Sequence, residues 1–72
     1  MPFVNVMITS GATREQKEEL IEGITELLVR VLDKNPASTH VVIDEISPGG
    51  WGIRGHSVAD LRSAGAPGVS KK

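Results

Sequence analysis

The chain has 72 residues, and its 8 Lys and Arg against 9 Asp and Glu give a formal net charge of −1. This length limits it to one domain, and the balanced charge argues against a nucleic-acid surface, which would normally show a basic stripe. The absence of cysteine excludes disulfides as a source of stability, and no His, Asp and Glu cluster has the spacing of a structural metal site.

The first segment with a clear pattern is residues 3–9, whose alternation predicts a β-strand. One face of this strand is wholly apolar, and the other is largely so. The wholly apolar face holds Val4, Val6 and Ile8, and the largely apolar face holds Phe3, Asn5 and Met7. A strand covered on both sides fits this composition better than one open to water.

A helix is predicted next. Thr13 and Gln16 have the spacing of a capping box, in which each side chain hydrogen-bonds the backbone N–H of the other. Apolar residues then recur at the period of a helix and form one wide stripe. They are Leu20, Ile21, Ile24, Leu27, Leu28, Val31 and Leu32. The pattern predicts a helix from about residue 14 to about residue 33, which Asn35-Pro36 would stop.

Residues 39–46, centred on Val41, Val42 and Ile43, predict a second strand. Two strands joined by a long helix make a β-α-β unit with parallel strands and a right-handed crossover. The fold class expected is therefore α/β (α+β), built on a single β-α-β unit. A two-stranded sheet with one helix is marginal alone, and so small a core supplies little stability. We therefore expect the unit to oligomerise.

The C-terminal third is punctuated by Gly and Pro. Residues 47–50 predict a turn, and the segment from Trp51 to Val58 predicts a small hairpin or extended arm. Residues 58–62 suit one helical turn. From Ser63 onward the composition is small and polar, which predicts a flexible tail over residues 63–72.

Targeting signals are not recognisable. The N-terminal stretch lacks the positive charge and long apolar core of a signal peptide. The longest apolar run is far shorter than the ~18 residues of a spanning helix. We expect a cytoplasmic protein with no membrane partner.

Pro2 is the first candidate for chemistry. Initiator Met is generally removed before a small residue such as Pro, which would leave a secondary amine on a rigid ring. An α-amino group has a pKa of about 7.7–8.0, and desolvation or a neighbouring cation lowers this pKa. Such an amine could act as a general base or form an iminium with a carbonyl substrate. From residue type alone, the commoner interpretation is that a Met-Pro start serves only the removal of the initiator Met.

Residues that could bind a substrate are fewer. Carbonyl and carboxylate substrates need fixed donors, most often Arg. Arg54 lies in the Gly-punctuated segment after Trp51, whereas Arg14 and Arg30 fall on the polar helix face, where solvation is the simpler interpretation. His40 opens the second strand beside the expected start of the first. Trp51, the single Trp, suits either an interface or an apolar pocket.

Three segments of the chain resemble the 4-oxalocrotonate tautomerase family. They are the start Met-Pro-Phe-Val-Asn-Val, the helix start Gly11-x-Thr13-x-Glu15-Gln16-Lys17, and Trp51-Gly52-Ile53-x-Gly55. Each motif is weak, but their order and spacing are specific, and the match is collinear from Pro2 to about Arg62. It predicts a tautomerase domain over residues 2–62 and leaves residues 63–72 as the tail.

The resemblance implies a β-α-β subunit with a C-terminal hairpin, assembled as a hexamer of paired dimers. It implies an isomerase in which Pro2 is the general base and moves a proton between carbon and oxygen, or along an unsaturated 2-oxo acid. The implied substrate is a small 2-oxo acid or enol, and no cofactor or metal is implied. The family's aromatic pocket residue falls on Trp51.

Two positions depart from the family pattern. The Arg that follows the Gly before the helix is Ala12 here, and the Arg early in the second strand is His40. In the family these arginines bind the substrate carboxylate and polarise the 2-oxo group. Ala12 can do neither, whereas His40 can donate a hydrogen bond. Arg54, at a position usually occupied by Gly, is a candidate for the missing charge.

Two alternatives stay open. The same scaffold could serve as a hydratase, dehalogenase or decarboxylase in which a charged Pro2 acts as an acid, and the pKa of the amine would distinguish that case. The chain could also be an inactive oligomeric or binding relative, which retention of Met1 would favour.

Overall fold

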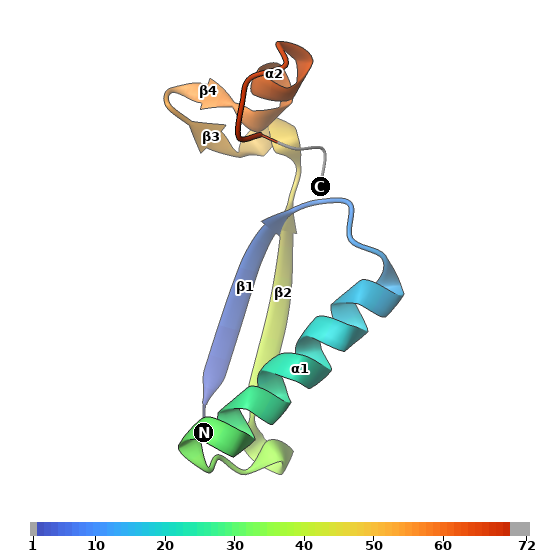
Figure 1. Ribbon diagram of the computed structural model, residues 1–72, viewed down its shortest axis with the longest axis vertical. Coiled ribbons are helices and arrows are strands. Elements are labelled where there is room, and N and C mark those ends of the chain that lie inside the picture. Colours follow the sequence, from blue (N-terminus) through green and yellow to red (C-terminus); the bar gives the residue numbers. More distant parts are fainter. Residues whose placement is uncertain (1, 70–72) are drawn as a thin grey trace. The chain divides into compact units, whose positions relative to one another are not determined.

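The computed structural model describes residues 2–69. The chain divides into two compact units, Met1–Met7 with Ala12–Asp44 and Ile8–Gly11 with Glu45–Lys72, and each is described by itself. The elements in chain order are β1 (Phe3–Thr9), α1 (Arg14–Leu32), the 3₁₀ turn η1 (Pro36–Ser38), β2 (His40–Ile46), the 3₁₀ turn η2 (Pro48–Gly50), β3 (Gly52–Ile53), β4 (His56–Ser57) and α2 (Val58–Ser63) (Figure 1). The last three residues of the expected tail lie outside the described residues.

Helix α1 begins at the predicted capping box. The Thr13 hydroxyl accepts from the Gln16 N–H at 3.1 Å, and the Gln16 side-chain oxygen accepts from the Thr13 N–H at 2.9 Å. At the other end Asp33 adopts a left-handed conformation with φ 54°, and its N–H donates to the Val29 carbonyl at 3.0 Å. The helix therefore ends at Leu32, one residue before the predicted end, because the backbone turns left-handed at Asp33.

The capping box gives a first testable prediction. Thr13→Ala should lower the free energy of unfolding by about 1 kcal/mol, because the Gln16 N–H loses its acceptor at the helix end. Urea unfolding at a fixed subunit concentration measures this loss. Thr25→Ala is the matched control, because the Thr25 hydroxyl only donates to the Ile21 carbonyl inside the same helix, at 2.7 Å. Alanine is the better helix former, so this control should be neutral or slightly stabilising. Equal losses in both variants would contradict the assigned cap.

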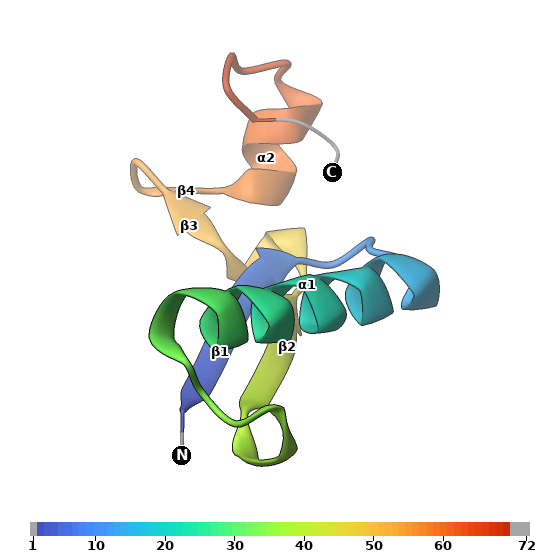
Figure 2. The same ribbon diagram turned by 60° about the horizontal axis from the view of Figure 1, so that its bottom comes forward.

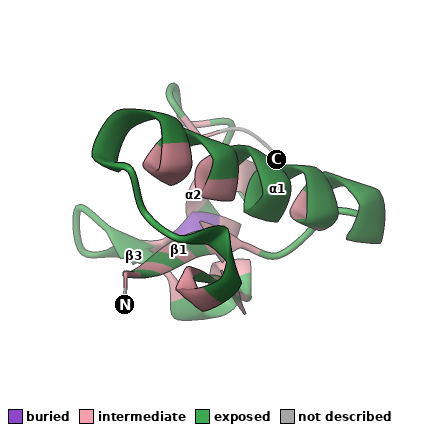
Figure 3. Ribbon diagram, turned by 90° about the horizontal axis from the view of Figure 1, so that it is seen from below, coloured by how far each residue is buried: buried purple, intermediate pink, exposed green. Residues whose placement is uncertain are grey.

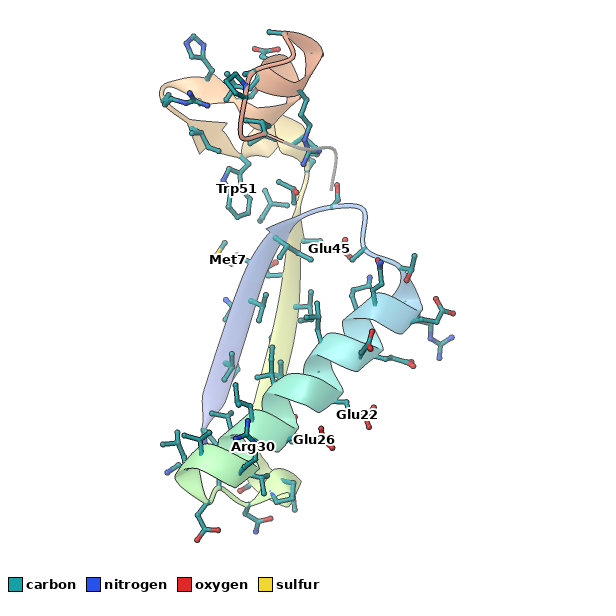
Figure 4. The ribbon with its side chains drawn as sticks, in the orientation of Figure 1. Met7, Glu22, Glu26, Arg30, Glu45 and Trp51 are labelled. Atoms are coloured by element: carbon teal, nitrogen blue, oxygen red, sulfur yellow. The ribbon has the colours of Figure 1, made fainter. Side chains whose placement is uncertain are left out.

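Strands β1 and β2 form a parallel two-stranded sheet, as predicted. Both strands alternate between half-buried and exposed residues in the same order. Helix α1 lies along one face of the sheet (Figures 1 and 2). Glu22 and Glu26 project from α1 on the side away from the strands, and Met7 projects from β1 on the side away from α1 (Figure 4).

The other face of the sheet is uncovered in the single chain. Phe3 is 66% exposed, Met7 54% and Val42 42%. The apolar stripe of α1 is also incompletely covered, because five of its seven residues remain exposed. Among residues 2–69 only Val58 is buried, at 2% exposure (Figure 3). Single exposed apolar residues need no explanation, but apolar surfaces of this extent mark an interaction site.

The second unit contains the predicted C-terminal hairpin. Strands β3 and β4 pair antiparallel, with Gly52 opposite Ser57 and Ile53 opposite His56. Helix α2 follows directly, capped by the Ser57 hydroxyl, which accepts from the Asp60 N–H at 3.1 Å. It covers the predicted helical turn and extends it to Ser63. No helix within residues 2–69 has the length and apolar character needed to cross a membrane.

Candidate active site

Pro2 lies at the start of the sheet. Its carbonyl accepts from the His40 N–H at 3.0 Å, so the first residues of the two parallel strands are neighbours. Pro2 is half-buried. Its nitrogen is an amide while Met1 is attached and becomes a basic secondary amine only after Met1 is removed. The chemistry expected of Pro2 therefore depends on that processing step.

The His40 side chain lies beside Phe3. The two rings are stacked, with centroids 6.5 Å apart and planes at 24°. Both residues belong to the exposed face of the sheet. Pro2, Phe3 and His40 are therefore gathered at one end of the sheet in the first unit. Phe3 was not among the sequence candidates, although the parallel pairing of the two strand starts could have indicated it.

Trp51 belongs to the second unit, where it holds the base of the hairpin. Its carbonyl accepts from the Val58 N–H at 2.7 Å, and its own N–H donates to the Pro48 carbonyl at 3.5 Å. Trp51 is half-buried, and Val58 across from it is the buried residue of the described chain. Trp51 is therefore fixed at its backbone while part of its ring remains accessible.

Arg54 occupies the tip of the same hairpin. Arg54 has φ 55° and Gly55 has φ 81°, and they form the two-residue loop between the paired Ile53 and His56. Positive φ at both loop positions defines a type I′ turn, in which Asn-Gly is the preferred pair. Arg54 is exposed, and its side chain has no hydrogen bond or ion pair among the described residues.

The loop between β1 and α1 carries a carboxylate contact that sequence reasoning missed. Glu45 Oε2 accepts from the Gly11 N–H at 3.1 Å, and the Ser10 N–H donates to the Ile46 carbonyl at 2.9 Å. Figure 4 labels Glu45 near the end of β2. No local sequence signal joins residues 34 positions apart; only the parallel pairing brings the two strand ends together. At Ala12 the loop offers a methyl group and no cation.

Within residues 2–69 no group of three or more His, Cys, Asp or Glu side chains is placed to hold a metal ion. The candidate chemistry of the described chain therefore concerns Pro2, His40, Trp51 and Arg54, the first two in one unit and the last two in the other.

Comparison with known proteins places this geometry in a family. A family profile described as "Tautomerase enzyme" matches residues 2–61. "Probable tautomerase K2" of Dickeya dadantii is 57% identical over 63 residues, which cover 86% of this chain and 94% of that protein. The crystal structure of DmpI from Helicobacter pylori is 46% identical, covers 86% of this chain and 97% of its own, and superposes with a TM-score of 0.80. A heterohexamer 4-oxalocrotonate tautomerase from Chloroflexus aurantiacus is 29% identical, covers 86% of this chain and 100% of its own, and has a TM-score of 0.79.

The chain belongs to the tautomerase family, and its relatives are 4-oxalocrotonate tautomerase-like proteins. The resemblance read from the three sequence segments is confirmed. Membership of this family supports an isomerase-type enzyme with tautomerase activity.

Proposed function

We propose that the protein is a tautomerase that interconverts the keto and enol forms of an unsaturated 2-oxo acid, or moves a proton along its conjugated chain. The family match over residues 2–61 supports the reaction class. The observation that carries the proposal is the position of Pro2, which lies half-buried directly before β1 and accepts a hydrogen bond from the His40 N–H through its carbonyl.

Pro2 acts as the general base once Met1 is removed. Its carbonyl is already used in the sheet, and this bond fixes the residue that carries the amine. Partial burial lowers the pKa of an amine, because it disfavours the charged form. A base must be neutral to take a proton, and its efficiency is highest when its pKa lies near the working pH.

The substrate is held by donors and by an apolar surface. His40 can donate a hydrogen bond to a carbonyl or carboxylate oxygen, and its stacking on Phe3 restricts the ring. Trp51 offers a partly accessible aromatic surface on a fixed backbone. Arg54 supplies a permanent positive charge. A base that removes a proton next to a carbonyl needs a hydrogen-bond donor or a positive charge nearby, because these stabilise the enolate oxygen as charge develops on it.

The active form is a homo-oligomer, proposed here as a hexamer. The exposed Phe3, Met7 and Val42 and the incompletely covered stripe of α1 support association, because one chain buries so little apolar surface. The Chloroflexus aurantiacus relative, which is described as a heterohexamer, supports the same size of assembly.

The domain proposed is residues 2–62, with residues 63–72 as a flexible tail.

The test blocks the amine and leaves the proline in place. An Ala inserted between Met1 and Pro2 keeps the Pro2 nitrogen an amide even after Met1 is removed. We expect kcat for phenylenolpyruvate to fall at least about 100-fold relative to Met-free protein, because the general base is lost. Intact-mass measurement establishes the N-terminus of each sample. Equal turnover by the blocked and Met-free proteins would refute Pro2 as the base.

A further inference from the structure

Phe3 is placed to set the direction of the His40 ring. The His40 N–H donates to the Pro2 carbonyl at 3.0 Å, and in a parallel ladder this bond puts residue 40 beside residue 3. The two rings meet there, with centroids 6.5 Å apart and planes at 24°. This is the offset, stacked arrangement that aromatic side chains favour.

No polar contact competes with this stack within residues 2–69, where the imidazole of His40 makes no hydrogen bond or ion pair. The carboxylate on the same face of β2 is Asp44, which lies four residues further along the strand and hence about 13 Å away. In many proteins the orientation of a functional imidazole is set by a hydrogen bond to its second nitrogen. In this chain the stack with Phe3 takes the place of that hydrogen bond.

Burial in the subunit does not account for Phe3. Its side chain is 66% exposed, whereas the residues of β1 that face α1 are half-buried. Met7 lies on the same face of the same strand and is 54% exposed, so the two residues resemble each other in burial. The stack with His40 is what distinguishes Phe3 from Met7, and Met7 is therefore a matched control position.

We propose that Phe3 is a positioning residue, which holds the His40 imidazole in one direction at the Pro2 end of the sheet. The inference rests on the proposed tautomerase function and adds a residue to it. A donor that is already oriented needs no reorganisation when charge develops on the substrate oxygen. Without the Phe3 ring, the imidazole would turn about its side-chain bonds and would have to be ordered in each turnover, which raises the barrier.

The kinetic test is Phe3→Leu, which removes the ring and keeps the side chain apolar. For phenylenolpyruvate we expect kcat to fall about 3- to 10-fold while KM changes less than about 2-fold, because an oriented donor acts mainly in the transition state. Phe3→Tyr keeps the ring and should retain kcat to within about 2-fold. Met7→Leu should do the same. The values are compared between variants whose sedimentation coefficients match.

A double-mutant cycle shows whether Phe3 acts through His40. His40→Gln removes the imidazole and leaves no ring to position. In that background Phe3→Leu should change kcat by less than about 2-fold, since the two residues act as a unit. An equal loss of kcat with and without His40 would overturn the proposal, because Phe3 would then act on the substrate or on the fold.

Nuclear magnetic resonance separates this proposal from the proposed function. The chain has two histidines, so the ring-proton signals of His40 and His56 can be followed separately. Phe3→Leu should shift the His40 signals, because the ring current of Phe3 is lost, and should leave the His56 signals in place. Unmoved His40 signals in this variant would refute the stack and the proposal with it. Absence of turnover by the original protein would instead refute the tautomerase and the catalytic use of the His40 ring, without altering the spectroscopic result.

Discussion

Replacing Pro2 by Ala in protein freed of Met1 should lower kcat for phenylenolpyruvate by about 10²- to 10⁴-fold, the usual contribution of a positioned general base. The variant keeps a terminal amine, but on a flexible residue, and this amine is primary. It loses the ring that holds the nitrogen in one direction. The loss should appear in kcat and kcat/KM alike, because proton transfer is made only in the transition state.

The fold gives this variant a clean control. Pro2 contributes its carbonyl to the sheet, at 3.0 Å from the His40 nitrogen, and Ala keeps that carbonyl. Circular dichroism and the sedimentation coefficient should therefore match those of the original protein. If an intact, fully assembled Pro2→Ala protein kept its original kcat, the general base would have to be another group.

The second large effect is expected at the uncovered face of the sheet. Val42→Lys should dissociate the proposed assembly and lower its stability by several kcal/mol per subunit, because a charge would be placed in the apolar surface that we propose other copies cover. Val42 is 42% exposed in the single chain and belongs to the same face as Phe3 and Met7. The released subunits should unfold, since Val58 is the one buried residue within residues 2–69 and gives the single chain little core of its own.

Analytical ultracentrifugation with thermal unfolding at several concentrations measures both consequences. Glu22→Gln is the matched control, since it changes the net charge by the same amount on the side of α1 that points away from the strands (Figure 4). Its effect should stay within about 0.5 kcal/mol. A Val42→Lys protein with unchanged mass and Tm would show that this face is not an interface.

Local sequence patterns predicted the elements and their order. Alternation in residues 3–9 and the capping box at Thr13 identified β1 and the start of α1, because both signals depend on residues close in sequence. A long helix between two strands requires a crossover connection, which made the strands parallel. Gly and Pro punctuation likewise indicated the hairpin after Trp51. Pro2 entered as a candidate through residue type and the family resemblance.

Contacts between distant residues were decided by the tertiary structure alone. The stacking of Phe3 on His40 and the bond from the Gly11 N–H to Glu45 join residues more than 30 positions apart. They follow from the register of two parallel strands, which periodicity does not specify. The left-handed conformation of Arg54 depends on the pairing of β3 with β4, because the pairing of Ile53 with His56 leaves a two-residue loop. The sequence by itself determined the elements of the chain and made Pro2 the candidate for the base. The packing of the chain decided which side chains lie beside Pro2 and how Arg54 is held.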